Sequence, residues 1–287
     1  MQSSADKLRI LLEGPELLVT PACYDALSAR LIERAGFNLS FMSGFAVSAG
    51  RLGLPDTGLI SYGEMLEQGR NICNAVSIPV IGDGDTGYGN ALNVKRTVMG
   101  YAQAGFGCIM IEDQVAPKRC GHTRGKQVVD REEAISRIRA AVDAREEGAN
   151  ILIMARTDAR ATDGFDEAMW RINAFSEQGA DILFLEAPEN ELEMRGFCEG
   201  VSGHKMVNLV EQGDTPLLPP SVLKEMGFKI ALYPLTMIEA ALAAMETALQ
   251  ALKSGQKPES LADFAHLREV VGFDSYYEAE KKYAASK

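Results

Sequence analysis

The sequence predicts an α/β fold, a closed (β/α)8 barrel of the TIM type followed by an extra C-terminal helical segment. Two observations predict it: apolar, β-prone runs alternate with helix-like stretches along most of the chain, and there are eight such runs. Strands that are apolar on both faces are typical of a parallel sheet covered by helices, and eight βα repeats fit a closed barrel. A doubly wound open sheet is the alternative, because one missed or added strand would change the count.

The expected elements follow one another closely along the chain. After a short amphipathic start around Leu8, helical patterns lie between successive strands, with apolar residues at helical spacing. We expect Met154, Met169 and Trp170 to be core residues. The expected strands cover 17–20, 39–42, 80–82, 108–111, 151–155, 182–185, 206–209 and 230–232, and the expected helices include 26–35, 62–75, 92–104, 131–145, 165–177 and 236–253.

Polar side chains collect just past the expected strands. They are Ser43, Asp83, Asp85, Glu112, Arg156, Asp158, Glu186 and Asn208. Taken singly, each could be an ordinary turn residue. Together, the carboxylates would repel one another without a common ligand, and the active site of such a barrel is built at the carboxyl ends of its strands. The pattern therefore predicts a site at this end of the barrel.

The segment 109–125 begins as a buried strand and continues as a polar loop from Glu112 onward. The loop carries a thiol among basic side chains: Lys118, Arg119, Cys120, His122, Arg124 and Lys126. A lone cysteine is more often a core residue, but this loop has almost no apolar residues to pack against. The local positive field favours the thiolate, and a carboxylate at a strand's end is a ready ligand for a hard metal ion. The segment therefore predicts chemistry rather than packing.

The composition is that of a globular protein and argues against several classes of partner. Of 287 residues, 46% are hydrophobic and 24% charged, and 29 basic against 40 acidic residues give a net charge of −11. This charge argues against nucleic acid or an anionic membrane surface as the main partner. The five scattered cysteines form no CxxC pair, which disfavours a zinc site or a disulfide framework. The chain shows no signal peptide and no apolar run of about 18 residues, so we expect a cytoplasmic protein.

A further helical segment follows the expected barrel. Past Pro258, apolar residues recur at spacings of three and aromatic residues follow them: Leu261, Phe264, Leu267, Val270, Phe273, Tyr276 and Tyr277. A closed barrel does not need this segment, so we expect it to pack across the barrel's base or to dock on a neighbouring subunit. Its aromatic residues favour an interface. We expect one domain, 1–287, made of a barrel at 1–254 and a helical oligomerisation segment at 255–287.

Six stretches, spread over nearly the whole chain, carry a family resemblance: SGFAVSAGRLGLPDTG at 43–58, GDGDTGYGN at 82–90, EDQVAPKRCGH at 112–122, ARTDA at 155–159, EAP at 186–188 and ALYPLT at 231–236. In this order they resemble the isocitrate lyase and phosphoenolpyruvate mutase superfamily. The cysteine of KRCGH, at 118–122, is the most specific feature, because the lyases of the superfamily carry it. The chain is most similar to its short lyases, the group of 2,3-dimethylmalate lyase, petal death protein and 2-methylisocitrate lyase.

The resemblance implies an oxo-acid lyase that breaks a carbon–carbon bond. The substrate would be a 2-hydroxy dicarboxylate of the 2-alkylmalate type, such as 2,3-dimethylmalate, and retro-Claisen cleavage would give pyruvate or another 2-oxo acid plus a carboxylate. A 2-methylisocitrate lyase, which yields pyruvate and succinate, is the alternative. Oxaloacetate hydrolysis or decarboxylation is less favoured, because Pro234 stands where related hydrolases tend to have serine. A binder that has lost catalysis is disfavoured by the retained thiol and carboxylates.

The resemblance also implies a metal site and an assembly. Asp85 would hold Mg²⁺, or Mn²⁺ in its place, and Asp56, Asp83 and Glu112 would bind it directly or through water. The loop 114–127 has the composition of a lid. The family precedent for the assembly is a homotetramer whose subunits exchange a C-terminal helix.

The remaining implied roles concern the substrate. Cys120 would protonate the carbanion left by cleavage, and Arg156 would counter the charge of the 2-oxo-acid half. Arg119 and His122 would bind the second carboxylate. Phe45, together with Pro234, adds apolar surface that favours an alkyl substituent over a further charge. The other expected substrate-binding residues are Tyr24, Ser43, Gly44, Gly121, Glu186, Asn208 and Pro234.

Overall fold

The computed structural model describes residues 2–121 and 125–284. The chain forms two compact units, Met1–Met237 and Ile238–Lys287. The expectation of one domain with a barrel at 1–254 and a helical segment at 255–287 stays a prediction. None of the helices within the described ranges combines the length and the apolar character that a bilayer crossing requires.

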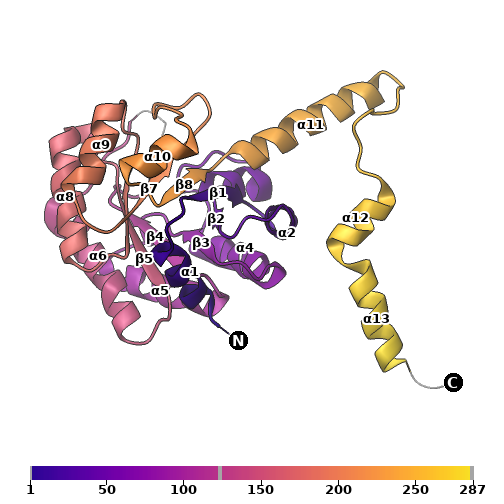
Figure 1. Cartoon of the computed structure of the whole chain (residues 1–287), viewed down its shortest axis with the longest axis horizontal. Helices are drawn as coiled ribbons and strands as arrows, with labels where there is room; N and C mark the ends of the chain where they lie inside the picture. The colour runs from indigo at the N-terminus through magenta and orange to yellow at the C-terminus, as the bar shows by residue number, and fades with distance from the viewer. Residues whose placement is uncertain (1, 122–124, 285–287) are drawn as a thin grey trace. The chain divides into compact units, whose positions relative to one another are not determined.

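Eight parallel strands close into a barrel in the first unit, in the order β1-β2-β3-β4-β5-β6-β7-β8. Figure 1 shows these strands with helices around them. The first and last strands complete the ring, because Leu18 of β1 pairs with Ile230 of β8. The predicted closed barrel is therefore confirmed, and the open sheet is wrong. The strands are β1 (Leu18–Cys23), β2 (Ser40–Met42), β3 (Val80–Asp83), β4 (Cys108–Glu112), β5 (Leu152–Thr157), β6 (Ile182–Leu185), β7 (His204–Asn208) and β8 (Ile230–Tyr233).

Alternate residues of each strand face two different cores. In β4, Met110 belongs to the cluster inside the barrel, whereas Ile109 belongs to the cluster between the strands and the helices. This alternation follows from the pleat, which turns successive side chains to opposite faces. Helix α1 (Ser4–Glu13) adds Leu8 and Leu12 to the inner cluster and so closes the amino end of the barrel. The carboxyl end is left for the site.

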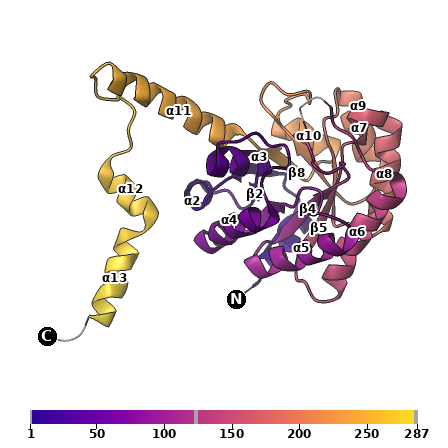
Figure 2. The same ribbon diagram turned by 180° about the vertical axis from the view of Figure 1, so that it is seen from behind.

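The connecting helices form the outer layer of the barrel. Asp25, Ser61 and Asn90 each begin a helix with a capping box, which satisfies amide groups that have no partner within the helix. Successive helices lie side by side, as Figures 1 and 2 show for α4, α5 and α6. All six predicted helices are present, with ends within one residue of the prediction. The helices of this layer are α2 (Ala26–Arg34), α4 (Tyr62–Ala75), α5 (Ala91–Ala104), α6 (Arg131–Glu146), α8 (Phe165–Glu177), α9 (Glu191–Gly200) and α10 (Pro220–Met226), and the short α3 (Gly44–Val47), η1 (Ser48–Leu52) and α7 (Ala159–Asp163) lie in loops.

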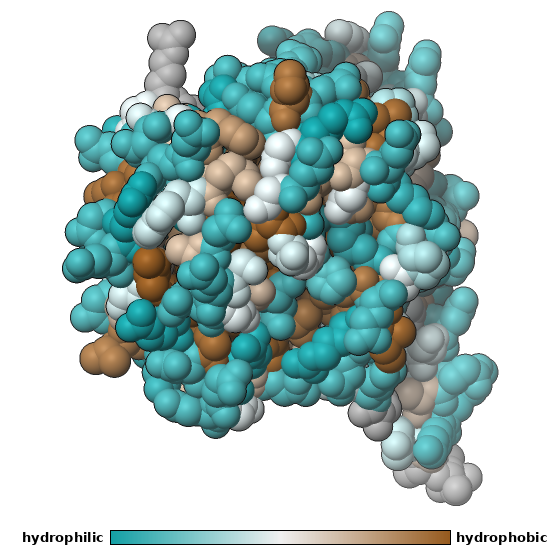
Figure 3. Space-filling model, turned by 60° about the vertical axis from the view of Figure 1, so that its left-hand side comes forward, coloured by the Kyte–Doolittle hydropathy of each residue, from teal (hydrophilic) through white to brown (hydrophobic). Residues whose placement is uncertain are grey.

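One expected core residue lies at the surface instead. Met154 is fully buried, but Trp170 on α8 is 39% exposed, and the guanidinium of Arg131 stacks over its ring at 3.8 Å. The buried face of α8 is formed by other residues, Ala168, Arg171, Ile172, Ala174 and Phe175. The face of the molecule in Figure 3 is mainly hydrophilic, with hydrophobic residues scattered between polar ones.

The second unit is helical and carries much exposed apolar surface. Of the predicted stripe, Val270 is buried, whereas Phe264 and Leu267 are exposed and Leu261 precedes the helix. The stripe is shorter than predicted because Asp263 caps the helix and so begins it after Leu261. The helices are α11 (Thr236–Lys253), α12 (Phe264–Val271) and α13 (Phe273–Tyr283).

Candidate active site

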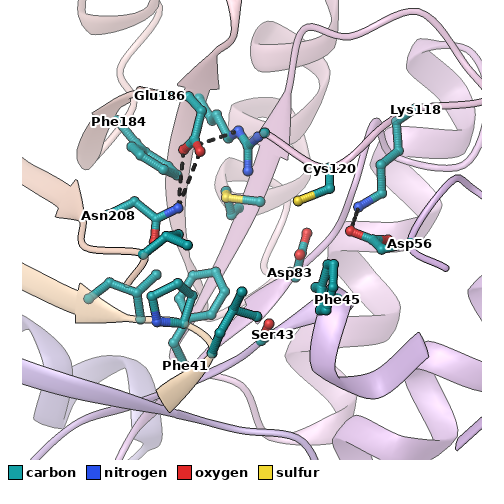
Figure 4. A pocket seen from close by; sticks show the side chains of 17 residues that line it. Phe41, Ser43, Phe45, Asp56, Asp83, Lys118, Cys120, Phe184, Glu186 and Asn208 are labelled. Carbon is teal, nitrogen blue, oxygen red and sulfur yellow. Dashed lines mark hydrogen bonds and ion pairs between the residues drawn. The ribbon is translucent and has the colours of Figure 1, made fainter. Parts of the chain in front are cut away.

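A pocket lies at the carboxyl ends of the strands, where the polar residues were predicted to meet. Its cavity of about 50 Å³ has room for about one or two water molecules. Figure 4 shows Cys120 between the pair of Lys118 and Asp56 on one side and Glu186 and Asn208 on the other. The predicted site residues that line the cavity are Ser43, Asp56, Asp83, Cys120, Gly121, Arg156, Glu186, Asn208 and Pro234.

Four buried carboxylates form a cluster beside the pocket. Asp83 ends β3, Glu112 ends β4, and Asp56 and Asp85 lie in loops. Asp83 accepts hydrogen bonds from the backbone amides of Gly44 and Asp85, both at 3.0 Å. Asp85 has a φ of 47°, in the left-handed region that is strained for a residue with a side chain. Strain of this kind is common at functional positions.

Burial raises the pKa of three of these carboxyl groups, those of Asp56, Asp83 and Glu112. Desolvation raises the pKa of Asp83 to about 6, and the neighbouring charge of Asp85 adds to the shift. Desolvation also raises the pKa of Glu112 well above its usual range, although the charge of Arg156 opposes it. Two oxygens, Asp56 Oδ1 and Glu112 Oε1, are buried without a hydrogen-bond partner among the described residues. Buried groups of this kind call for a cation.

A lysine from the cysteine loop supplies one positive charge. Lys118 Nζ lies 2.6 Å from Asp56 Oδ2 and 2.9 Å from Asp85 Oδ1, and its side chain is 6% exposed. Burial lowers the pKa of Lys118, but the carboxylates outweigh burial and hold it well above its usual value. From the sequence, Lys118 was expected only as part of a basic loop, and this pairing was not predicted. Several carboxylates but only one cation, Arg156, were predicted at the strand ends. This imbalance of charge was the signal that a further cation was needed.

The same carboxylates fit a hard divalent cation. As they stand, no three Asp, Glu, His or Cys side chains in the described ranges converge on a point that could hold a metal ion. Asp56, Asp83, Asp85 and Glu112 nevertheless offer only oxygen donors, and Asp56 and Glu112 each have a buried oxygen without a hydrogen bond to any described group. Such donors are those that Mg²⁺ prefers. The residues present therefore fit Mg²⁺.

The loop that carries Cys120 is fixed at its base. The side chain of Gln114 accepts a hydrogen bond from the Arg119 amide and donates one to the Arg119 carbonyl, each at 2.9 Å. Gln114 also forms an antiparallel bridge with Val128. Cys120 is half-buried, and its sulfur points into the pocket (Figure 4). The alternative that Cys120 is a core residue is therefore not what the structure shows.

Arg156, near the end of β5, is held by a carboxylate that contacts two of its nitrogens. Arg156 Nε donates to Asp158 Oδ2 at 2.8 Å and Nη2 donates to Asp158 Oδ1 at 3.0 Å. Arg156 Nε also lies 3.4 Å from Glu112 Oε2 and 3.9 Å from Glu186 Oε2. Asn208 Nδ2 donates to Glu186 Oε1 at 3.2 Å. Arg156 is thus a charged group held in a fixed position at the pocket.

The remaining lining of the pocket is apolar. Phe45 and Pro234, which were predicted to add apolar surface, both lie there. The other apolar lining residues were not predicted as part of the site; they are Phe41, Met110, Phe184, Val210, Leu232 and Leu235. Several of these belong to the cluster inside the barrel. Because successive side chains of a strand point to opposite faces, that alternation could have been used to predict them.

Some predicted site residues lie outside this lining. Arg119 is exposed and Tyr24 is half-buried, and neither lines the pocket. His122 lies outside the described residues. The others contact lining residues rather than the cavity itself: Gly44, Asp85 and Glu112.

Comparison with known proteins decides the family. A family model described as phosphoenolpyruvate phosphomutase matches residues 8–253, which include every strand of the barrel. The chain belongs to this family. The resemblance predicted from the motifs is thereby confirmed.

Curated relatives in the phosphoenolpyruvate phosphomutase family include named lyases. The 2,3-dimethylmalate lyase of Eubacterium barkeri is 42% identical, over 99% of this chain and 100% of the relative. The 2-methylisocitrate lyase of Aeropyrum pernix is 40% identical, over 96% of this chain and 88% of the relative. These relatives agree with the predicted class of enzyme, an oxo-acid lyase.

Solved structures related to the phosphoenolpyruvate phosphomutase family share the fold but differ in name. Oxaloacetate acetylhydrolase with 3,3-difluorooxalacetate has a TM-score of 0.95 at 35% identity, covering 99% of this chain and 98% of that one. The 2,3-dimethylmalate lyase structure has a TM-score of 0.94 at 37% identity, covering 99% and 97%. Phosphonopyruvate hydrolase in complex with oxalate and Mg²⁺ has a TM-score of 0.88 at 30% identity, covering 98% and 99%. The fold alone therefore does not identify the reaction, which depends on the residues of the site.

Proposed function

We propose that the protein is a Mg²⁺-dependent carbon–carbon lyase. Its substrate is a 2-alkylmalate-type 2-hydroxy dicarboxylate, such as 2,3-dimethylmalate, and its products are pyruvate or another 2-oxo acid and a second carboxylate. The observation that carries the proposal is the position of Cys120, whose thiol points into a pocket with buried charged groups on one side and an apolar wall on the other. The 42% identity to a 2,3-dimethylmalate lyase supports it.

Retro-Claisen cleavage makes three demands on such a site. The 2-hydroxyl group must pass its proton to a base, a carboxylate of the site or water, the bond between C2 and C3 must break with its electron pair passing to the departing fragment, and that carbanion must gain a proton. Cys120 gives this proton, because its sulfur points into the cavity. Arg156, held by Asp158, binds a substrate carboxylate.

The carboxylate cluster holds the metal in this proposal. Bound to Asp56, Asp83, Asp85 and Glu112, Mg²⁺ (or Mn²⁺) would stabilise negative charge on the 2-oxo-acid oxygens. Gly44 donates its amide to Asp83 and so keeps the cluster next to the fragment that it binds. The phosphonopyruvate hydrolase complex with oxalate and Mg²⁺ supports this assignment, because oxalate resembles the 2-oxo-acid half.

A general acid has to keep its proton until the bond breaks. Lys118 and Lys126 flank Cys120, but each is paired with a buried carboxylate, Lys118 with Asp56 and Lys126 with Asp158. Their positive field at the sulfur is therefore partly offset. This arrangement suits a thiol that acts as an acid better than a permanent thiolate.

The other predicted roles remain proposals. Ser43 and Tyr24 bind the 2-oxo-acid half together with Gly44, and Gly121, Glu186, Asn208 and Pro234 shape the pocket. Arg119 and His122 bind the second carboxylate.

Cleavage of 2-methylisocitrate is the second candidate, because a lyase of that name is 40% identical to the chain. That substrate carries a third carboxylate, which needs a cationic or hydrogen-bonding partner. Phe45, Phe184 and Pro234 instead present apolar surface to the cavity, which suits an alkyl group. Oxaloacetate hydrolysis is less favoured, because Pro234 offers no hydroxyl group.

A substrate panel tests the proposal. Pyruvate release would be measured from 2,3-dimethylmalate, 2-methylmalate and 2-methylisocitrate, glyoxylate release from isocitrate, and oxalate release from oxaloacetate. We expect kcat/KM to be highest for an alkylmalate, by roughly ten- to a hundred-fold, because buried methyl groups discriminate only modestly. A faster reaction with 2-methylisocitrate would favour the second candidate, and oxalate release would favour a hydrolase. A folded protein that turns over none of these compounds would contradict the proposed chemistry.

We also propose that the protein is a cytoplasmic homotetramer whose second unit lies in subunit contacts. That unit exposes apolar side chains along all three of its helices, including Leu242, Met245, Leu249, Leu252, Phe264, Leu267, Phe273 and Tyr276. Exposed apolar surface of this extent marks a protein-binding face. All five cysteines are thiols, which suits a reducing compartment. The net charge of −11 gives no support to nucleic acid or a membrane surface as partner.

A further inference from the structure

Lys126 ties the cysteine loop to the barrel at a different point from Lys118. Its ammonium group donates to the backbone carbonyl of Gly121, the residue next to Cys120, and also to Asp158 Oδ1 at 3.1 Å. The side chain of Lys126 is 5% exposed and that of Asp158 is 0% exposed. Solvent therefore screens this ion pair little.

The same contacts lead back to Arg156. Asp158 binds Lys126 and also accepts the two hydrogen bonds from the Arg156 guanidinium. Gly121 lies directly against that guanidinium, because a Cβ atom at Gly121 would come within 2.6 Å of Arg156 Nη2 and 2.2 Å of Glu186 Oε1. Gly121, Lys126, Asp158 and Arg156 thus form a closed ring of contacts. The ring sets the distance between the backbone that carries the thiol and the arginine.

One side of this ring is rigidly attached to the barrel. The Asp158 amide donates to Asp113 Oδ1 at 2.9 Å. Asp113 Oδ2 accepts from Thr157 Oγ1 at 2.6 Å and from Arg171 Nη1 of helix α8 at 3.1 Å. These contacts join the ends of β4 and β5 to the helix layer. Asp158 is therefore a fixed anchor, and the placement of the loop depends on Lys126.

We propose that Lys126 is a positioning residue, which fixes Gly121, and with it Cys120, relative to Arg156. The role needs a cation with more than one N–H group, because a carbonyl and a carboxylate must both be satisfied from one side chain. Methionine has a similar length but no donor, so it would leave both acceptors of the ring without this partner. The link to cleavage rests on the proposed function, whereas the contacts themselves do not depend on which bond is broken.

The accessibility of Cys120 tests the proposal without any assay of activity. The variants are Lys126→Met, Lys126→Arg and, as a matched control, Lys224→Met, which breaks an exposed pair with Glu16 on the outside of the barrel. Each folded variant is treated with iodoacetamide, and labelling of the Cys120 peptide is followed by mass spectrometry. Rates are compared at the high-pH plateau, where the thiol is ionised in every variant. In Lys126→Met we expect the plateau rate to rise by about tenfold, because the loop opens more often.

Kinetics with an alkylmalate give a second measurement. In Lys126→Met, kcat should fall by about 100-fold, because a displacement of about 1 Å between the acid and the bound substrate has that effect. The affinity for pyruvate with Mg²⁺ should stay near that of the unaltered protein, because Ser43 and the carboxylate cluster are untouched and Asp158 keeps its two hydrogen bonds to Arg156. Lys126→Arg keeps a cation with several donors and should restore most of both properties.

The outcomes separate this proposal from the proposed function. An unchanged plateau rate in a folded Lys126→Met variant overturns the positioning role, as does equal labelling of Lys126→Arg and Lys126→Met. A rate that rises only in Lys126→Met supports it. If labelling changes as expected while the unaltered protein cleaves no alkylmalate, the proposed function fails and the positioning role of Lys126 stands.

Discussion

Cys120 is the residue on which the proposed chemistry depends most directly. Replacing Cys120 by Ser should lower kcat by about 10²- to 10⁴-fold, because a hydroxyl group is a far weaker acid than a thiol. Calorimetry should show that Cys120→Ser still binds pyruvate and Mg²⁺. Cys73→Ala, which alters a half-buried cysteine on α4, should cleave normally and serves as the control. Loss of pyruvate binding in Cys120→Ser would mean that the thiol has a structural role instead.

The buried carboxylates make a prediction about metal removal. EDTA should abolish cleavage, and added Mg²⁺ or Mn²⁺ should restore it, because Asp83, Asp85 and Glu112 cannot polarise the substrate without a cation. Asp85→Ala should be inactive with any metal, while circular dichroism shows a folded protein. Full activity in the presence of chelator would contradict the metal assignment.

The raised pKa of Asp83 links stability to pH. In EDTA, the unfolded side chain ionises near 3.8, whereas the folded one keeps its proton up to about 6. The free energy of unfolding should therefore fall as pH rises through this window, by roughly 3 kcal/mol for this group. Mg²⁺ takes the place of the proton, so the stabilisation that it gives should grow over the same window. Urea unfolding with EDTA or Mg²⁺ at several pH values measures both trends, and a metal effect that shrinks with rising pH would contradict them.

Among the structural elements, the cysteine loop and helix α4 should respond differently when a glycine is replaced by alanine. Gly121→Ala places a Cβ atom 2.2 Å from Glu186 Oε1, so the loop must shift away from the pocket. We expect kcat to fall by about 100-fold, because the acid is misplaced. Gly63→Ala on α4 meets only Ser61 Oγ, at 3.9 Å, and should raise stability by about 0.5–1 kcal/mol because alanine favours helix. Equal activity of the two variants would show that the loop tolerates displacement.

The regular elements could be predicted because their signals are local. Helices at 62–75 and 165–177 lie where the apolar periodicity placed them, and Ser61 caps the first of them. Strand β5 runs to Thr157, two residues past the prediction, because Arg156 is polar yet pairs within the ladder with Glu112 and Phe184. The barrel then explains why the carboxylates, Arg156 and Asn208 meet, since the strand ends share one face.

The contacts of the cysteine loop could not be predicted in this way. Lys118 pairs with Asp56, and Lys126 pairs with Asp158. The partners lie far apart in the sequence, so no local sequence pattern predicts either pair. Composition could show a cationic loop but not that the side chains of Lys118 and Lys126 are buried or that Arg119 is exposed. The prediction that Trp170 is a core residue was wrong for a related reason. Neighbouring residues form the buried face of α8, and the guanidinium of Arg131 lies over the Trp170 ring at the surface.

At the scale of the whole molecule, the apolar second unit predicts assembly. Sedimentation at micromolar concentration should show a tetramer, because a stable monomer would leave residues such as Phe264 and Tyr276 in water. Truncation before Pro258 should give an unstable or aggregating protein. A truncated chain that stays monodisperse and active would contradict the role of this unit, as would a monomeric full chain.

The pairing of β1 with β8 also has a consequence for synthesis in the cell. Leu18 leaves the ribosome early, whereas Ile230, its partner across the closing seam, is among the last barrel residues to emerge. Until then, the growing sheet has two open edges that can pair with other nascent chains. Closure of the ring is therefore a late step that depends on a distant contact, which slows folding. Substitutions that weaken β8 should lower the yield of folded protein more than they lower the turnover of the molecules that do fold.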